Sequence, residues 1–185
     1  NSILESMTEG VQVHFKSSPI GRQSHGYNAN NGFLLHVNGE RVFVRSGKRD
    51  ISGSPHHTQW MWETKADNAI LVNGEGQIPH SFKATGRITA FETSPDFDYV
   101  EGDCTASYPQ LTKAIRRIYF YKPGTIVIHD VLVAKEPATF QWLLHAPGEF
   151  QMGENETTWT GKGTTVRVQW LAPAGLNITQ TDQYE

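Results

Sequence analysis

Hydrophobic and polar residues alternate in short runs along most of the chain, and Gly, Pro, Asn and Asp separate the runs. A period of two is typical of half-buried β-strands, whereas the spacing of an amphipathic helix is nearly absent. Many short strands with few helices predict an all-β fold, an antiparallel β-sandwich that takes up residues 1–185 as one domain. The runs outside hairpins are residues 11–15, 69–72, 87–92, 140–145 and 166–171.

Two pairs of runs predict β-hairpins, because each pair flanks a dipeptide that favours a turn. Both hairpins join strands that follow one another directly in the sequence, as expected for an antiparallel sheet. The predicted hairpins are residues 33–37 and 42–44 around Asn38-Gly39, and residues 115–121 and 126–133 around Pro123-Gly124.

Residues 46–65 show no clean period and are predicted to form a long loop at the rim of a sheet. A loop of this length in a compact domain is usually functional or mobile. Trp60 and Trp62 would share one face of an extended segment. Such a pair can stack on sugar rings, and it can equally form an edge of the core. The adjacent His56 and His57 would point in opposite directions, so the two rarely bind one metal ion.

The composition limits the classes of partner. The net charge of −3 offers no global attraction to nucleic acid or to an acidic polymer, so affinity for a polyanion requires a local basic patch. Four cations without an intervening acid supply one candidate patch, or else a charged strand edge; they are Arg41, Arg45, Lys48 and Arg49. Cys104 is the single cysteine. No apolar run approaches the roughly 20 residues of a membrane span, and no nucleotide-binding motif occurs.

Two histidines stand in contrasting contexts. His25 precedes Gly26 and several Asn residues on a polar loop, where an imidazole can be exposed and can titrate near neutrality. The alternative is a turn whose Asn side chains bond to their own backbone. His145 ends an apolar run, where a lone histidine is more often a satisfied core residue than a catalyst.

Four segments follow one another in a fixed order along the chain. They are His25-Gly26 with Asn31 and Phe33, the run Val44-Arg45-Ser46-Gly47, residues 67–77, and residues 116–145 with Trp142-Leu143-Leu144-His145. In this order they resemble the heparinase II/III-like polysaccharide lyases, in a variant similar to the dermatan sulfate epimerase group. The resemblance covers about residues 10–150.

The resemblance implies a two-part enzyme, in which an N-terminal α/α toroid precedes this β-sandwich. Such enzymes cleave uronate-containing polysaccharides by β-elimination and are mostly secreted or periplasmic. In the family, one sandwich histidine faces a Tyr, a His and an Asn of the toroid, and His25 matches it. His25 and Tyr27 are therefore the predicted catalytic residues. The predicted substrate-binding residues are Asn31, Arg45, His57, Trp60, Trp62 and Asn68.

The chain departs from the family at a structural metal site. Many relatives bind zinc or manganese through three side chains that align with Tyr27, Arg45 and Asp67. A Tyr, an Arg and an Asp make a poor zinc set. No metal or other cofactor is therefore predicted, and the hypothesis is that Arg45 takes the place of the cation and pairs with Asp67.

Three functions remain open. The first is a lyase half that works with the toroid on an acidic polysaccharide; the isolated 185-residue chain is expected to be inactive. The second is a non-catalytic carbohydrate-binding or structural sandwich. The third is a uronate C5-epimerase. Glycosaminoglycan, alginate and other uronate polymers all fit the first function, while nucleic acid and membranes are not predicted partners. The oligomeric state stays open.

Overall fold

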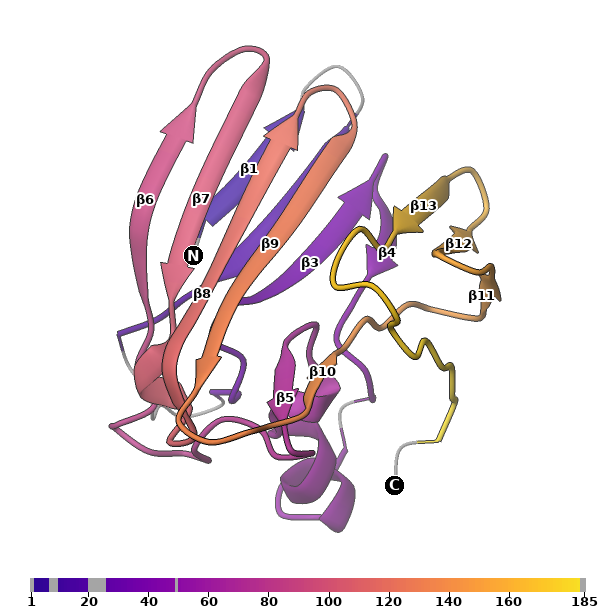
Figure 1. Ribbon diagram of the computed structural model, residues 1–185. Helices are drawn as coiled ribbons and strands as arrows, with labels where there is room; N and C mark the ends of the chain where they lie inside the picture. The colour runs from indigo at the N-terminus through magenta and orange to yellow at the C-terminus, as the bar shows by residue number, and fades with distance from the viewer. Residues whose placement is uncertain (1, 7–9, 20–25, 49, 184–185) are drawn as a thin grey trace.

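The computed structural model describes residues 2–6, 10–19, 26–48 and 50–183. The chain is an antiparallel β-sandwich, which confirms the predicted fold class (Figure 1). Two four-stranded sheets form its layers, and a small three-stranded sheet lies to one side. Within the described residues, no helix is long and apolar enough to cross a membrane.

Each sheet joins strands that run antiparallel to their neighbours. The first sheet has the order β1-β2-β3-β4 and the second the order β6-β7-β8-β9, while β10 pairs with β5 and the small sheet is β11-β12-β13. The strands are β1 (Ser2–Ser6), β2 (Val11–Lys16), β3 (Gly32–Val37), β4 (Glu40–Phe43), β5 (Ile70–Val72), β6 (Arg87–Thr93), β7 (Phe97–Asp103), β8 (Leu111–Tyr121), β9 (Thr125–Ala134), β10 (Phe140–Trp142), β11 (Phe150–Met152), β12 (Glu156–Thr160) and β13 (Thr165–Gln169).

Both predicted hairpins are confirmed. The β3–β4 hairpin turns at Asn38-Gly39, where both residues have the positive φ that a tight hairpin turn requires. The β8–β9 hairpin is the longest pairing in the molecule. The predicted long loop, residues 46–65, is not irregular throughout. It contains a π-helical turn, η1 (His57–Met61), and the start of a 3₁₀ turn, η2 (Thr64–Ala66). A third short turn, η3 (Thr105–Ser107), precedes β8.

The core lies between the two large sheets. Alternation along β2 turns Val11, Val13 and Phe15 inward, where they meet Ile118 and Phe120 of β8. A second, smaller cluster lies at the end of the sandwich that carries β5 and η3. Trp142 packs against both clusters and therefore connects the two parts of the interior.

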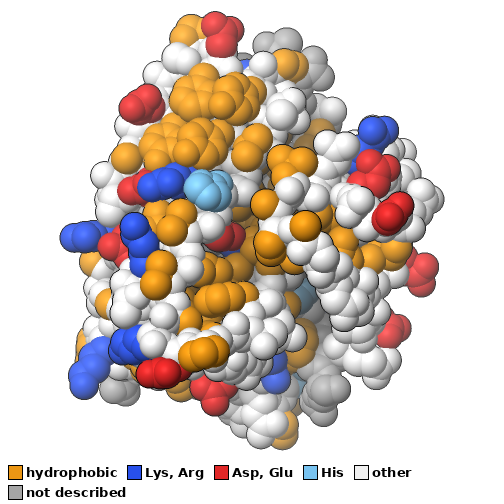
Figure 2. Space-filling model, viewed as in Figure 1, with side chains coloured by type: hydrophobic (Ala, Val, Ile, Leu, Met, Phe, Trp, Pro, Cys, Tyr) orange, Lys and Arg blue, Asp and Glu red, His pale blue; other side chains and the backbone are white. Residues whose placement is uncertain are grey.

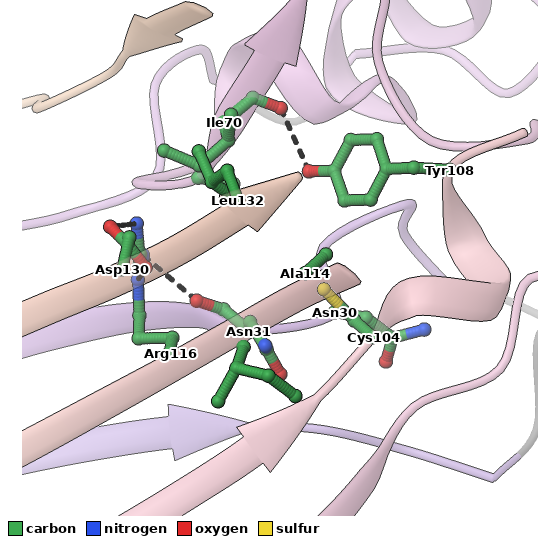
Figure 3. Close-up of a pocket in the computed structure, with 11 residues that line it drawn as sticks. Asn30, Asn31, Ile70, Cys104, Tyr108, Ala114, Arg116, Asp130 and Leu132 are labelled. Atoms are coloured by element: carbon green, nitrogen blue, oxygen red, sulfur yellow. Dashed lines mark hydrogen bonds and ion pairs between the residues drawn. The ribbon is translucent and has the colours of Figure 1, made fainter. Parts of the chain in front are cut away.

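An ion pair lies between these clusters. Arg116 is 1% exposed and binds the Asp130 carboxylate with two hydrogen bonds of 2.8 Å. The same guanidinium donates to the carbonyls of Asn31 and Asn68, so its charge is well supplied with acceptors. A cavity of about 10 Å³ lies beside it (Figure 3). Cys104 borders this cavity, and burial raises the pKa of its thiol, which makes the only cysteine unreactive.

The outer face of the second sheet carries a patch of aromatic rings. Phe97 and Tyr121 have ring centroids 5.1 Å apart, and Tyr99 and Tyr119 have centroids 4.9 Å apart. Hydrophobic side chains gather over the upper part of β7 and β8 in Figure 2. This face lies opposite the core and away from the loops that contain the predicted site residues.

Candidate active site

The loop that leads into β3 is fixed to the interior by its asparagines. Asn28 donates its backbone N–H to the Trp62 carbonyl at 3.0 Å. The Asn30 side chain accepts from the Ser18 N–H and donates to the Ala84 carbonyl and to the Ser107 hydroxyl. These bonds hold Gly26 and Tyr27 in place. The predicted catalytic His25 directly precedes them and lies outside the described residues.

Arg45 lies at the centre of the candidate site. Its Nε donates to Asp67 Oδ1 at 2.5 Å, and its Nη2 donates to Asp67 Oδ2 at 3.3 Å and to the Met61 carbonyl. The guanidinium carbon lies 3.5 Å from the centroid of the Tyr27 ring. The predicted pairing of Arg45 with Asp67 is confirmed, and Tyr27 lies against the same guanidinium.

The described residues of the site carry more positive than negative charge. Asp67 is buried, and burial raises the pKa of its carboxyl, while Arg45 and Lys16 act against that rise. Burial also lowers the pKa of Lys16, which Asp67 opposes. The Lys16 ammonium donates to the Tyr27 carbonyl at 3.0 Å. Among the described residues, two cations thus surround one carboxylate, which leaves an excess of positive charge beside Tyr27.

A metal ion does not fit these side chains. A divalent cation needs several neutral or anionic ligands, and Asp67 is the one carboxylate that Arg45 binds among the residues that the structure describes. Arg45 already occupies both oxygens of that carboxylate and brings a positive charge that would repel the ion. Among the described residues, no group of three His, Cys, Asp or Glu side chains could hold a metal.

Two of the predicted substrate-binding residues, Asn68 and Asn31, have structural roles in the interior. Asn68 is 1% exposed; its amide donates to the Phe33 and Val44 carbonyls and its oxygen accepts from the His145 N–H. Asn31 is also buried, and its amide donates to the Gly102 carbonyl. Both amides thus bond to the backbone in the interior, and a contact of either side chain with substrate stays a prediction.

The two tryptophans do not share a face, because the segment between them is helical rather than extended. Trp62 packs between the rings of His57 and His80, with centroids 4.5 Å and 4.2 Å away. Trp60 lies under the Lys65 ammonium, 5.1 Å from the ring centroid. Trp62 and His57 therefore form an aromatic group next to Asn28, while Trp60 packs against Lys65. The role of these three side chains in binding substrate stays a prediction.

The three described members of the predicted basic patch do not form one cluster. Arg41 lies opposite His36 in the β3–β4 pairing, whereas Arg45 turns inward to Asp67. Lys48 is exposed, and Arg49 lies outside the described residues.

Two groups at the site, Lys16 and the Met61 carbonyl, had no signal in the sequence. A third group, the half-buried His145, ends an apolar run, and its imidazole lies near the Lys65 and Asp67 carbonyls. Lys16 occupies an ordinary polar position of an alternating strand, and a backbone carbonyl leaves no mark in a sequence. His145 was expected to be a satisfied core residue, but its Nε2 is buried with no hydrogen-bond partner among the described residues.

A groove of about 620 Å³ runs along the other side of η1 and η2. Thr64 connects it to the site, since its hydroxyl donates to the Asn28 carbonyl at 2.7 Å and accepts from the Gln77 N–H. The groove contains Glu63 and Glu75 beside Lys65. Burial raises the pKa of Glu63, while Lys65 opposes the rise. The two carboxylates make this groove less suited to an acidic polymer than the Arg45 site.

Comparisons with solved structures show the same fold at low sequence identity. The heparan sulfate lyase HepC of Pedobacter heparinus aligns with a TM-score of 0.71 and 17% identity, over 87% of this chain and 25% of that chain. A heparinase III aligns with a TM-score of 0.77 and 18% identity, over 90% of this chain and 26% of that one. The chain thus spans about a quarter of the length of these structures.

No curated protein matches the sequence. The family described as "Heparinase II/III-like, C-terminal" matches residues 3–183, which is nearly the whole chain. That family belongs to the polysaccharide lyases. The chain therefore belongs to the heparinase II/III-like family, as its C-terminal domain.

Proposed function

We propose that this chain is the β-sandwich half of a lyase that cleaves uronate-containing polysaccharide by β-elimination. An N-terminal α/α toroid of the same protein would complete the active site, and the protein would act outside the cytoplasm, in a secreted or periplasmic form. The observation that carries the proposal is the fixed guanidinium of Arg45 beside the Tyr27 ring, two residues after His25.

The reaction begins with a proton that is hard to remove. The C5 proton of a uronate lies beside a carboxylate, so its loss becomes easier when that carboxylate is neutralised. Arg45 carries a permanent charge, and the N–H groups of an arginine form strong, charge-assisted hydrogen bonds with carboxylates. We assign Arg45 to the uronate carboxylate, where it stabilises the negative charge that develops as the proton leaves.

The proton and the leaving oxygen then need an acid and a base. The base takes the C5 proton, the electron pair forms the C4–C5 double bond, and the C4–O bond breaks. The acid protonates the departing oxygen. We assign His25, together with side chains of the toroid, to these two transfers. The isolated chain is then inactive because it supplies one side of the site.

The substrate class follows from the charge of the site. Two cations and one carboxylate favour an anionic chain, and glycosaminoglycans meet this requirement. The name of one matched structure, a heparan sulfate lyase, supports the same class.

The test follows the ultraviolet absorbance of the new double bond, in the intact protein that contains this chain. We expect a rise on heparan, chondroitin, hyaluronan or alginate. His25→Ala is expected to lower turnover by about 100-fold or more, which is the usual contribution of a general acid or base. His129→Ala is the control, because His129 is exposed on β9, on the outer face of the second sheet.

An unchanged rate for His25→Ala in a folded protein would remove His25 from the mechanism. If none of the four polymers gives a rise, exchange of the C5 proton with deuterated water identifies the epimerase alternative. Binding without exchange or elimination would leave the sandwich as a binding module.

A further inference from the structure

The Arg45 guanidinium has partners on three sides. One side is the Asp67 carboxylate, which takes two hydrogen bonds, and the second is the Met61 carbonyl of η1. The third is the Tyr27 ring, whose centroid lies 3.5 Å from the guanidinium carbon. A carboxylate, a carbonyl and an electron-rich ring face are all groups that attract a cation.

We propose that the Arg45 guanidinium is a built-in cation, which stands where the family resemblance implies a metal ion and makes this site independent of metal. Tyr27 and Asp67 are its positioning residues. The three positions aligned with the metal ligands do meet in space, but one of them supplies the positive charge itself.

The guanidinium also keeps donors for a ligand. Nε and Nη2 make all of its hydrogen bonds to described residues, and Nη1 makes none. The side chain is 23% exposed, so it is not sealed in the core. Nη1 carries two N–H groups, and a carboxylate or sulfate oxygen of an acidic sugar can accept from them. The identity of this ligand rests on the proposed function, whereas the absence of a metal requirement does not.

The first experiment measures metal content and thermal stability of the intact protein. We expect less than stoichiometric zinc, manganese or calcium, and the same melting temperature with and without a chelator. Stoichiometric metal whose removal lowers the melting temperature would overturn the proposal. This measurement needs no variant, so it stands even if changes at Arg45 prevent folding.

The second experiment measures binding of a short heparan oligosaccharide by calorimetry. Arg45→Gln removes the charge and is expected to weaken binding about tenfold or more, as for the loss of a hydrogen bond to a charged group. Arg45→Lys keeps the charge but loses the planar fork, so an intermediate loss is expected. Arg41→Gln is the matched control, because Arg41 is an exposed arginine of the neighbouring strand β4. Wild-type affinity for a folded Arg45→Gln protein would overturn the ligand-binding role.

The third experiment restores a metal set. Tyr27→His combined with Arg45→Asp replaces the ring and the cation by two zinc ligands next to Asp67. We expect this double variant to bind about one zinc ion per chain, measured by metal analysis, with a gain in thermal stability on zinc addition. A folded double variant without zinc affinity would show that Arg45 does not occupy a cation position.

Failure of this proposal is distinct from failure of the proposed function. Metal content and zinc binding are read without turnover, so they report on Arg45 alone. Turnover of the His25→Ala variant reports on the lyase assignment whatever the metal result is.

Discussion

At the scale of single residues, buried polar side chains determine where the site groups lie. The Asn68 amide joins β3, the end of β4 and the segment after β10, because it bonds to the Phe33 carbonyl, the Val44 carbonyl and the His145 N–H. Its neighbour Asp67 holds Arg45. A change at Asn68 is therefore expected to disturb the Arg45 site through these backbone contacts.

The half-buried imidazole of His145 is expected to make the unfolding free energy depend on pH. Burial lowers the pKa of its imidazole; the carbonyls of Lys65 and Asp67 oppose this, and Arg45 adds to it. The unfolded chain then binds the proton near the ordinary pKa of about 6.5, at a pH where the folded chain does not. The stabilising contribution is complete above that value and is lost as the pH falls through the lowered pKa of the folded state.

We expect the unfolding free energy of the wild type to fall more steeply between neutral and mildly acidic pH than that of His145→Gln. Urea titrations at a series of pH values measure both curves, and their difference isolates this imidazole from the carboxylates that both proteins share. His129→Gln is the control, since His129 is exposed. Parallel curves for wild type and His145→Gln would contradict the expectation.

Some residues of the site could be predicted from the sequence, and others could not, because their contacts form only in the folded chain. The Arg45–Asp67 pair could be predicted, because the aligned motif positions of the two residues bring opposite charges into one site. Lys16 and the Met61 carbonyl could not, because β2 and η1 approach Tyr27 only in the folded chain. The buried roles of Asn31 and Asn68 were missed for the same reason, since their partners are backbone groups of distant strands.

At the scale of elements, strand β7 has no space for a side chain at Gly102. Gly102 faces the core, and a Cβ atom there would lie 2.5 Å from Asn31 Oδ1 and 2.6 Å from Phe15 Cζ. Gly102→Ala is expected to lower the unfolding free energy by about 1–3 kcal/mol, as for overpacking of a core.

Gly124→Ala is the control for this prediction, because nothing lies within 4 Å of a Cβ atom at that turn. Denaturant titrations compare the two variants with the wild type. Equal stability of the two variants would mean that the sheets separate easily at β7, contrary to the close packing described above.

Some elements follow from a local sequence pattern, and others do not. The Asn38-Gly39 and Pro123-Gly124 hairpins follow from local turn chemistry, so the sequence predicts them. The turn η1 has no such pattern. It is held by Ser54, whose hydroxyl accepts from the His57 N–H and whose carbonyl accepts from the Thr58 N–H, and by the packing of Trp62 between two histidines.

At the scale of the whole molecule, Arg116 connects parts of the chain that are distant in sequence. It pairs with Asp130 on β9 and bonds to the carbonyls of Asn31 and Asn68. Arg116→Met leaves the Asp130 carboxylate without its cation in the interior. We expect a loss of about 3–5 kcal/mol, which is a large share of the stability of a domain.

Arg117→Met is the matched control, because the Arg117–Glu101 pair is partly exposed on the outer face of the same strand. Thermal and denaturant unfolding measure both variants. A double variant that also changes Asp130 to Leu is expected to recover part of the loss, since an apolar pair can replace a buried ion pair. No recovery would indicate that Arg116 acts mainly through the two carbonyls.

The position of Trp142 also gives the molecule an optical probe. Its indole N–H donates to Asp130, and its ring meets the Trp170 ring edge to face, with centroids 5.2 Å apart. Trp170 follows β13, near the end of the described chain. Two indoles at this distance couple electronically, so the near-ultraviolet circular dichroism of the pair reports whether the C-terminal segment stays packed against β10.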